Sequence, residues 1–340
     1  MLRAPARSLV ALSVASALLA LGACGDDDPE SAAPSVAPST ASSTTAPSPS
    51  ASPSKAAPKV KPSTDLDAVK VSGDYGKAPK VSVKAPWAID KTRTKVLEAG
   101  DGAEVKTGQT VDVNYYGVNG RTGKKFDDSF SRGQSVAFPL GQVVPGFQKG
   151  LVGQRQGSRV AVAMPGADGY DAAGGNPQIG VEVGDTLLFV VDIVGVQLTG
   201  PSGKAVTPKA GLPTVTVKDG KPQISVPKTD PPPALQVQPL IKGTGRKVAA
   251  GDNLTFNYQW VAWKDGRELE TSYGSQPANL PVAGLIAGMK EGLTGQTVGS
   301  RVLLVIPPAK AYPEGNATPR VDKGETLVMV VDLLFASPAQ

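Results

Sequence analysis

The stretch Gly184-Asp-Thr-Leu-Leu-Phe-Val-Val-Asp192 returns in this chain as Gly324-Glu-Thr-Leu-Val-Met-Val-Val-Asp332. Upstream of it, Gly157-Ser-Arg-Val-Ala-Val-Ala-Met-Pro165 returns as Gly299-Ser-Arg-Val-Leu-Leu-Val-Ile-Pro307. The second copies follow the first by 140 residues (324 − 184) and 142 residues (299 − 157). Solenoid repeats have periods of about 20–50 residues, so a period this long indicates a duplicated domain. The sequence therefore predicts two tandem domains of one fold.

Within each copy the apolar residues recur at every second position. Val111, Val113 and Tyr115 alternate with polar residues, as on a β-strand with one buried face. A helix is expected only from Pro145 to about Gly153, because proline suits a first helical position. We expect an α+β fold in which an antiparallel sheet wraps one short helix.

The N-terminus has the pattern of an export signal. Arg3 and Arg7 precede an apolar run from Leu9 to Leu21, shorter than the about 20 residues of a membrane-spanning helix. The run ends in Leu21-Gly-Ala-Cys24, which resembles a bacterial lipobox. A buried cysteine in an ordinary helix is the alternative, but Cys24 is the single cysteine and lies where an export signal would end. We expect lipidation of Cys24 and an extracytoplasmic, membrane-anchored protein.

A segment rich in Ser, Ala, Pro and Thr follows, and its composition cannot bury enough apolar surface to fold. Short pieces before each copy also match, as Lys80-Val-Ser-Val83 and Gln223-Ile-Ser-Val226 show, and whether they add edge strands stays open. The expected organisation is a signal peptide (1–23), a disordered tether (24–65), domain 1 (66–198, core 91–196), a linker (199–211) and domain 2 (212–337, core 232–335).

Composition excludes several classes of enzyme. The chain has no histidine and one cysteine, so it can form neither an intrachain disulfide nor a Ser-His-Asp triad, nor a zinc site of several cysteines. The net charge of +5 comes from lysines and arginines scattered among carboxylates, which is not the basic stripe of a nucleic-acid surface. We expect no metal, no cofactor and no nucleic-acid partner.

Five segments of the first copy carry a resemblance to a known family. They are Val113-Asn-Tyr-Tyr-Gly117, Gly123-Lys-Lys-Phe-Asp-Asp-Ser129, Phe138-Pro-Leu-Gly141, Val143-Val-Pro-Gly-Phe-Gln-Lys-Gly-Leu151 and Thr186-Leu-Leu-Phe-Val-Val-Asp192. In this order and spacing they resemble the FKBP-type peptidyl-prolyl cis/trans isomerases. The resemblance covers residues 91–196 and, more weakly, 232–335. It implies two half-barrels, each wrapped on its short helix, with a shallow apolar pocket between sheet and helix.

The resemblance also implies which residues line the first pocket. They are Tyr115, Phe126, Asp127, Phe138, Val143, Val144, Phe147, Tyr170, Val181 and Phe189. The family usually has tryptophan at the pocket floor, where this chain has Phe147. The aromatic residues would clasp the proline ring, and the hydroxyls of Tyr115 and Tyr170 would bind the substrate backbone. Asp127 would lie at the pocket edge, with Arg132 as its candidate partner, since an aspartate beside core aromatics is costly without a partner or a function.

The second copy matches less well. Its pocket positions are Tyr258, Leu269, Glu270, Leu285, Ile286, Met289, Tyr312, Val321 and Met329. Leucine and methionine replace three phenylalanines there, so the pocket stays apolar but loses most of its aromatic lining. We expect weak or absent isomerase activity in domain 2, which would instead hold unfolded substrate near domain 1.

Parts of the sequence also suggest two other functions. One is a non-catalytic, lipid-anchored chaperone or scaffold that binds peptides in both pockets. The other is a penicillin-recognising enzyme, suggested by Ser52-Pro-Ser-Lys55 and Lys106-Thr-Gly108. No Ser-Asp-Asn motif accompanies them, and Ser52 lies in the expected tether. The favoured hypothesis is an isomerase of X-Pro bonds in exported or envelope proteins. Its partners would be proline-containing polypeptides, FK506- or rapamycin-like macrolides, and the membrane through Cys24.

Overall fold

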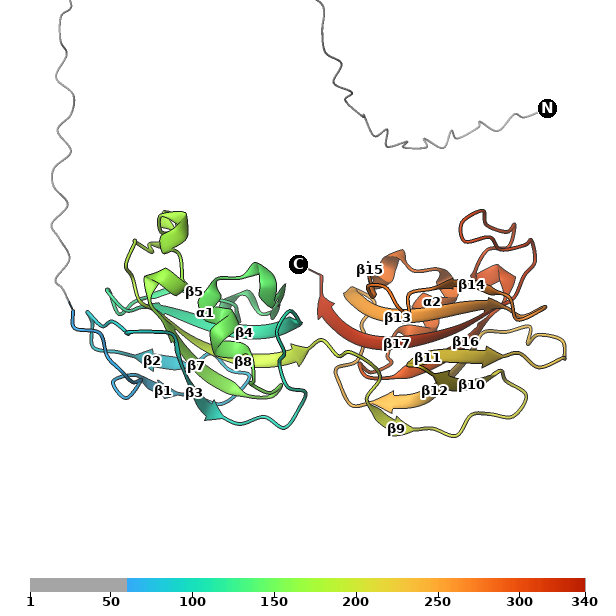
Figure 1. The fold of residues 1–340 in the computed structure, drawn as a ribbon, viewed down its shortest axis with the longest axis horizontal. Coiled ribbons are helices and arrows are strands. Elements are labelled where there is room, and N and C mark those ends of the chain that lie inside the picture. The colour runs from blue at the N-terminus through green and yellow to red at the C-terminus, as the bar shows by residue number, and fades with distance from the viewer. Residues whose placement is uncertain (1–59, 340) are drawn as a thin grey trace, which may run out of the picture. The chain divides into compact units, whose positions relative to one another are not determined.

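The structure is a computed structural model that describes residues 60–339. The expected signal peptide, Cys24 and nearly all of the expected tether lie outside the described residues. No helix within 60–339 is long and apolar enough to cross a membrane. The two copies form two separate sheets, each beside one short α-helix, which confirms the predicted α+β fold (Figure 1).

Domain 1 has a six-stranded sheet with the order β3-β7-β8-β4-β5, and β6 pairs with β4. All neighbouring strands run antiparallel. The strands are β3 (Arg93–Glu98), β4 (Thr110–Asn119), β5 (Lys125–Asp128), β6 (Val136–Pro139), β7 (Arg159–Met164) and β8 (Leu187–Val196). Helix α1 (Pro145–Leu151) has its proline in the first turn, as expected, and ends two residues earlier than the sequence suggested.

Domain 2 repeats this order as β14-β13-β17-β16-β12, with β15 paired to β13. Its elements are β12 (Gln236–Gly243), β13 (Asp252–Ala262), β14 (Glu268–Thr271), β15 (Ala278–Pro281), α2 (Ala287–Leu293), β16 (Arg301–Ile306) and β17 (Leu327–Pro338). A seventh strand, β9 (Gly203–Ala205), pairs with β12. This strand lies within the expected linker 199–211, so the sheet of domain 2 takes in part of that segment.

The short repeated pieces before each core form separate two-stranded hairpins and do not extend the main sheets. They are β1 (Lys70–Ser72) with β2 (Lys80–Ser82), and β10 (Thr214–Lys218) with β11 (Lys221–Ser225). Val69, Val81 and Val83 pack with Leu188 and other residues of the face of the sheet that is turned away from α1. The second hairpin packs in the same way on Val328 and Val330. Each sheet is therefore buried on both faces, which explains why every residue of β7 and β16 is buried.

The last residues of the expected tether are also part of the fold. Ser63 forms a parallel bridge with Ile89, and its backbone N–H donates to Ala88 O at 2.8 Å. Leu66, at the start of domain 1, is 5% exposed. The fold thus includes residues that precede the expected boundary at residue 66.

A buried ion pair connects the first hairpin to its sheet. Arg159 Nε and Nη2 donate to the two oxygens of Asp192 at 2.5 and 2.7 Å, and both side chains are at most 2% exposed. Arg159 also donates to the carbonyl oxygens of Gly73 and Lys77, while Gly76 N–H donates to Asp192 at 2.7 Å. Arg301 and Asp332 repeat the pair in domain 2.

We expect Asp192→Ala to destabilise domain 1 by about 3–5 kcal/mol, because it leaves Arg159 buried and uncompensated. The exposed pair between Asp74 and Lys77 in the same hairpin provides the control, and Asp74→Ala should cost less than about 1 kcal/mol. Hydrogen exchange in β7 and β8 measures both effects. Equal exchange in the two variants would contradict this role of the ion pair.

Candidate functional site

Aromatic side chains from five elements of domain 1 meet on the inner face of the sheet. Phe189 of β8 lies at the centre, with ring centroids 4.7 Å from Phe147, 5.4 Å from Phe126 and 6.1 Å from Tyr115. Phe138 packs edge-on against Phe147 at 5.8 Å. Such tilted and edge-to-face pairs each contribute about 0.5–1.5 kcal/mol beyond area burial. We call Tyr115, Phe126, Phe138, Phe147, Tyr170 and Phe189 the aromatic patch.

The packing of α1 on β7 sets the position of Phe147. Gly150 faces Val162 so closely that an added Cβ would lie 2.4 Å from a valine methyl group. The absence of a side chain at Gly150 therefore lets the helix approach the strand and presents Phe147 to Phe189.

A second glycine leaves room for the aromatic rings themselves. A Cβ on Gly117 of β4 would lie 2.8 Å from Phe126 and 3.1 Å from Phe189. Only glycine at this position leaves space for both rings.

All ten predicted residues of the first site gather here. Six of them are partly buried and pack around a buried core that includes Phe147, Val181 and Phe189, and the partly buried Asp127 joins them through Tyr115. Ile179, which the sequence analysis did not name, packs with them from the loop between β7 and β8. The patch is apolar at its centre, and its charged groups lie at one edge.

That edge is a three-residue polar network. The Tyr115 hydroxyl donates to Asp127 Oδ2 at 2.5 Å and accepts from Arg132 Nη2 at 2.7 Å. Arg132 Nη1 donates to Asp127 Oδ1 at 2.8 Å, and its guanidinium carbon lies 5.5 Å from the centre of the Tyr115 ring. The expected Asp127–Arg132 pair is present. Tyr115, expected to bind the substrate backbone, instead gives its only proton to Asp127.

Tyr170 is therefore the free phenol of the patch. Among residues 60–339 no hydrogen bond is found for its hydroxyl, although the residue is half-buried. Burial, and then the negative charge of Asp127, raise the pKa of Tyr170. Its hydroxyl therefore stays protonated at neutral pH and can donate to a substrate carbonyl.

The second site has the same strand arrangement as the first but carries different side chains. Tyr258 donates to Glu270 Oε1 at 2.8 Å, but Ser275 stands where Arg132 would be, and no cation pairs with Glu270 within the described residues. Trp260 occupies the register of Gly117, opposite Met329 and Glu270 on the neighbouring strands. Its ring lies 5.7 Å from Tyr258 and 6.4 Å from Tyr312.

Trp260 thus fills the space that belongs to two phenylalanine rings in domain 1. The indole is 8% exposed, and its Nε1–H has no hydrogen-bond partner within residues 60–339. The predicted residues Leu285, Met289, Val321 and Met329 are buried, and Leu269, Ile286 and Tyr312 pack beside them. Sequence analysis missed Trp260, although it follows Tyr258 by two positions and so lies on the same face of β13.

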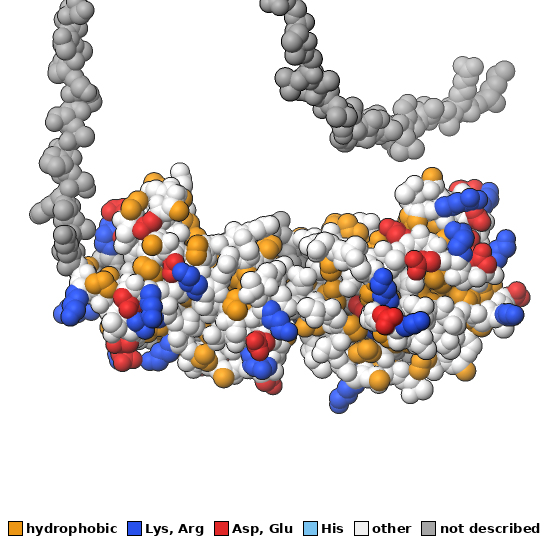
Figure 2. Space-filling view, viewed as in Figure 1, with side chains coloured by type: hydrophobic (Ala, Val, Ile, Leu, Met, Phe, Trp, Pro, Cys, Tyr) orange, Lys and Arg blue, Asp and Glu red, His pale blue; other side chains and the backbone are white. Residues whose placement is uncertain are grey.

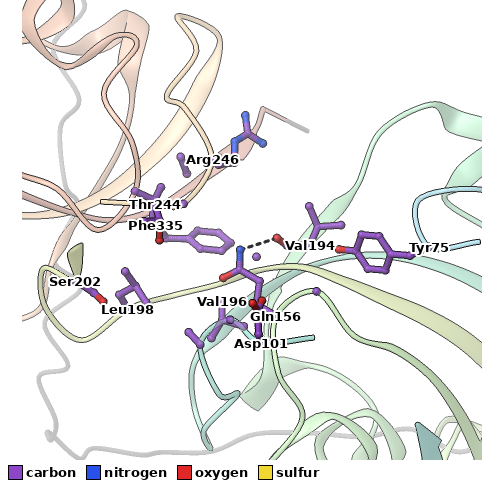
Figure 3. A pocket seen from close by; sticks show the side chains of 17 residues that line it. Tyr75, Asp101, Gln156, Val194, Val196, Leu198, Ser202, Thr244, Arg246 and Phe335 are labelled. Atoms are coloured by element: carbon purple, nitrogen blue, oxygen red, sulfur yellow. Dashed lines mark hydrogen bonds between the residues drawn. The ribbon is translucent and has the colours of Figure 1, made fainter. Parts of the chain in front are cut away.

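A cavity of about 450 Å³ lies away from both sites (Figure 3). Its lining includes Gln156, Val194, Arg246 and Phe335 and none of the predicted site residues. Gln156 donates to Val194 O, and Arg246 is paired with Asp252, so neither group is free to bind a ligand. On the face drawn in Figure 2, Lys and Arg are interspersed with Asp and Glu, as the sequence predicted. No group of three or more metal-ligating side chains occurs within the described residues.

Comparisons with known proteins agree with this geometry. The model of the FKBP-type peptidyl-prolyl cis-trans isomerase family matches residues 102–194 and 244–334. The chain belongs to this family. A probable FK506-binding protein of Corynebacterium glutamicum is 39% identical over 118 residues, which is 34% of this chain and 98% of that protein. An FK506-binding protein of Streptomyces anulatus is 42% identical over 106 residues, or 30% and 83% of the two chains.

A solved structure, that of FkpA from Escherichia coli, is 35% identical and aligns with a TM-score of 0.29 over 31% of this chain and 47% of that one. The family assignment confirms the predicted resemblance and the enzyme class. The protein is a peptidyl-prolyl cis-trans isomerase with two FKBP domains. Which domain is active, and which residues act, stay predictions.

The polar network predicts how the enzyme responds to pH. Burial, and then the hydrogen bond to Asp127, raise the pKa of Tyr115 from 10.0 to about 12. A folded-state pKa above the unfolded value means that this stabilisation is complete below pH 10 and is lost as the pH rises through 12. We expect isomerase activity to stay flat from pH 7 to about 10. A fall centred near pH 10 that Tyr115→Phe removes would contradict this.

Proposed function

We propose that domain 1 is the catalytic domain and that domain 2 is weakly active or inactive and holds substrate. The observation that carries the proposal is a residue difference at one shared strand position, where domain 1 has Gly117 and domain 2 has Trp260. Gly117 leaves room for the rings of Phe126 and Phe189 at the base of the first site, whereas Trp260 occupies the matching position in domain 2.

The chemistry needs no nucleophile or metal. Rotation about a peptide bond crosses a barrier of about 18–20 kcal/mol because resonance keeps the amide planar and polar. The twisted transition state has lost that resonance, so an apolar surface favours it over the planar ground state. Phe126, Phe147 and Phe189 would provide this surface for the proline ring.

Tyr170 would donate its free hydroxyl to a backbone carbonyl of the substrate and fix the orientation of the bond. Asp127, which is paired with Arg132 and accepts a hydrogen bond from Tyr115, would border the site without placing an uncompensated charge against the twisted amide. Each tenfold gain in rate requires about 1.4 kcal/mol, so a few such contacts suffice.

The substrates would be unfolded or folding polypeptides of the cell envelope. The Leu21-Gly-Ala-Cys24 motif and the apolar run before it support export and lipid anchoring. Leu269 and Ile286 of domain 2 are only partly buried and leave apolar surface at the second site, which suits a domain that binds without turnover. Holding a chain there would raise its effective concentration at domain 1. FK506-like macrolides are expected ligands of domain 1, since relatives carry that name.

Matched double variants of the protein comprising residues 58–340 test whether domain 1 catalyses and domain 2 holds substrate. Phe126→Ala with Asp127→Leu should lower kcat/KM for a short X-Pro peptide at least about tenfold. Leu269→Ala with Glu270→Leu, at the same positions of domain 2, should leave peptide turnover unchanged. It should slow the refolding of a protein whose rate is limited by proline isomerisation, since only a long chain can bind both domains.

FK506 should inhibit the wild-type protein and the domain 2 variant alike. Peptide turnover that survives the domain 1 changes would reverse the assignment of the two sites. No turnover by the folded wild-type protein would favour the non-catalytic, peptide-binding chaperone.

Anchoring is tested at Cys24, the only thiol in the chain. Cells fed labelled palmitate should label the wild-type protein, which should sediment with membranes. Cys24→Ser should abolish both the label and the sedimentation. Labelled Cys24→Ser protein would exclude this residue as the lipid attachment site.

A further inference from the structure

The loop between β7 and β8, residues 165–186, reaches across the first site. Tyr170 of this loop is one of the residues of the aromatic patch, and Ile179 and Val181 of the loop pack with the same cluster. Short 3₁₀ turns make up much of it, and no strand of the sheet includes it. What fixes the loop therefore decides where the free hydroxyl of Tyr170 lies.

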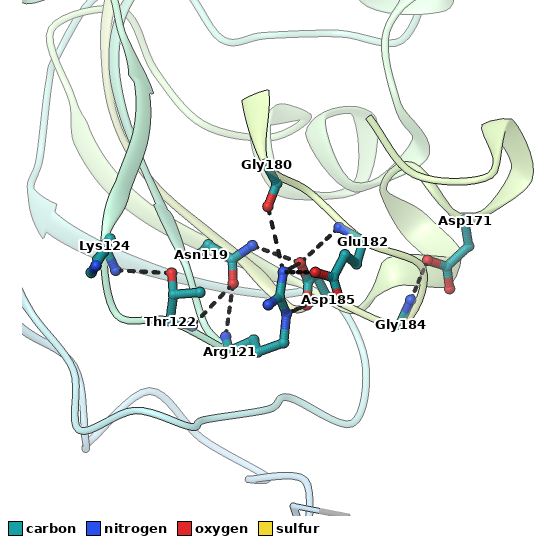
Figure 4. Close-up of polar contacts among 9 residues, drawn as sticks. All are labelled: Asn119, Arg121, Thr122, Lys124, Asp171, Gly180, Glu182, Gly184 and Asp185. Atoms are coloured by element: carbon teal, nitrogen blue, oxygen red, sulfur yellow. Dashed lines mark hydrogen bonds and ion pairs between the residues drawn. The ribbon is translucent and has the colours of Figure 1, made fainter. Parts of the chain in front are cut away.

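A polar cluster ties the end of this loop to the turn between β4 and β5. Asp185, whose side chain is 3% exposed, accepts from Asn119 Nδ2 at 2.6 Å and from Arg121 Nε and Nη2 at 2.7 and 3.1 Å. It also accepts from Glu182 N–H at 2.9 Å. Figure 4 shows Asn119 and Arg121, from the end of β4 and the turn after it, converging on Asp185.

The same arginine holds two more points of the loop. Arg121 Nη2 lies 3.1 Å from Glu182 Oε1 and 3.5 Å from Gly180 O, which flank Val181 on either side. Asn119 Oδ1 in turn accepts from the backbone N–H of Arg121 at 2.9 Å and so fixes the turn. A planar guanidinium with several donors suits this multiple attachment better than an ammonium group.

Domain 2 lacks the cluster although it has the loop. Ala262, Lys264 and Glu325 stand at the positions of Asn119, Arg121 and Asp185. The nearest cation to Glu325 is Arg267, at 4.0 Å, and no ion pair of Lys264 is found within residues 60–339. The two domains therefore differ in how firmly the loop is attached, as they differ in the patch beneath it.

We propose that Asn119, Arg121 and Asp185 form a clamp that positions the β7–β8 loop, with Tyr170 and Val181, over the aromatic patch of domain 1. The proposal rests on domain 1 being the catalytic domain. These three are positioning residues, since they act through the loop and do not touch the substrate. Without the clamp the loop must be ordered each time a substrate binds, which weakens ground-state and transition-state binding equally.

Arg121→Ala tests the clamp by two independent measurements. Amide exchange in residues 165–186 should become about tenfold faster while exchange in β7 and β8 is unchanged. KM for an X-Pro peptide should rise about five- to tenfold, with kcat changed by less than about twofold. Lys264→Ala, at the matching position of domain 2, should change neither quantity.

Two further variants separate positioning from stability. Arg121→Lys keeps the charge but loses the fork of donors, so its KM should lie between those of wild type and Arg121→Ala. If the clamp acts through Tyr170, the double variant Arg121→Ala with Tyr170→Phe should have a KM no higher than that of the more severe single variant.

Unchanged exchange in the loop, or faster exchange with unchanged KM, would overturn the proposal. If Arg121→Ala also speeds amide exchange in β7 and β8, the same two measurements on the Arg121→Lys protein decide the question. Should turnover prove to reside in domain 2, the exchange measurement would still decide whether the clamp holds the loop, separately from the assignment of the active domain.

Discussion

Burial of each sheet on both faces is the constraint on which the rest of this structure depends. An antiparallel sheet commonly faces water on one side, and its strands then alternate between apolar and polar residues. Here α1 covers one face of the first sheet and the β1–β2 hairpin covers the other. The outer face nevertheless contains Arg159 and Asp192, which neutralise each other and bond to the backbone of the hairpin. The hairpin thereby becomes part of the domain, although the family model starts only at residue 102.

The two domains share this sheet arrangement and differ mainly in the side chains at equivalent positions. Tyr115 and Asp127 of domain 1 are completed by Arg132, so the edge of the patch carries a paired carboxylate. In domain 2 the Tyr258–Glu270 pair has no matching cation among the described residues. A carboxylate beside an apolar surface needs a partner, and Asp127 has both a cation and a phenol where Glu270 has a phenol alone.

The sequence alone was sufficient to predict much of the fold. The repeats predicted two domains, and the segment starting at Pro145 predicted the helix that presents Phe147. The role of the hairpins was not foreseen, although Leu188 and Val190, between the inward-facing residues of β8, already indicated burial of the outer face. The clamp was missed because Asn119, Arg121 and Asp185 meet only through tertiary contacts, and no local pattern distinguishes them from surface polar residues.

The difference between Gly117 and Trp260 shows that neighbouring positions of each site must match in size. A side chain at Gly117 would collide with Phe126 and Phe189, so a tryptophan there requires smaller or more flexible neighbours. Domain 2 has them, as Leu269 and Met329. Conversely, glycine at Trp260 alone would leave a void in a core where Met329 is fully buried. The three positions are energetically coupled, because each sets the space available to the others. Two phenylalanine rings beside a glycine, and one indole beside a leucine and a methionine, are thus alternative ways of packing the same backbone.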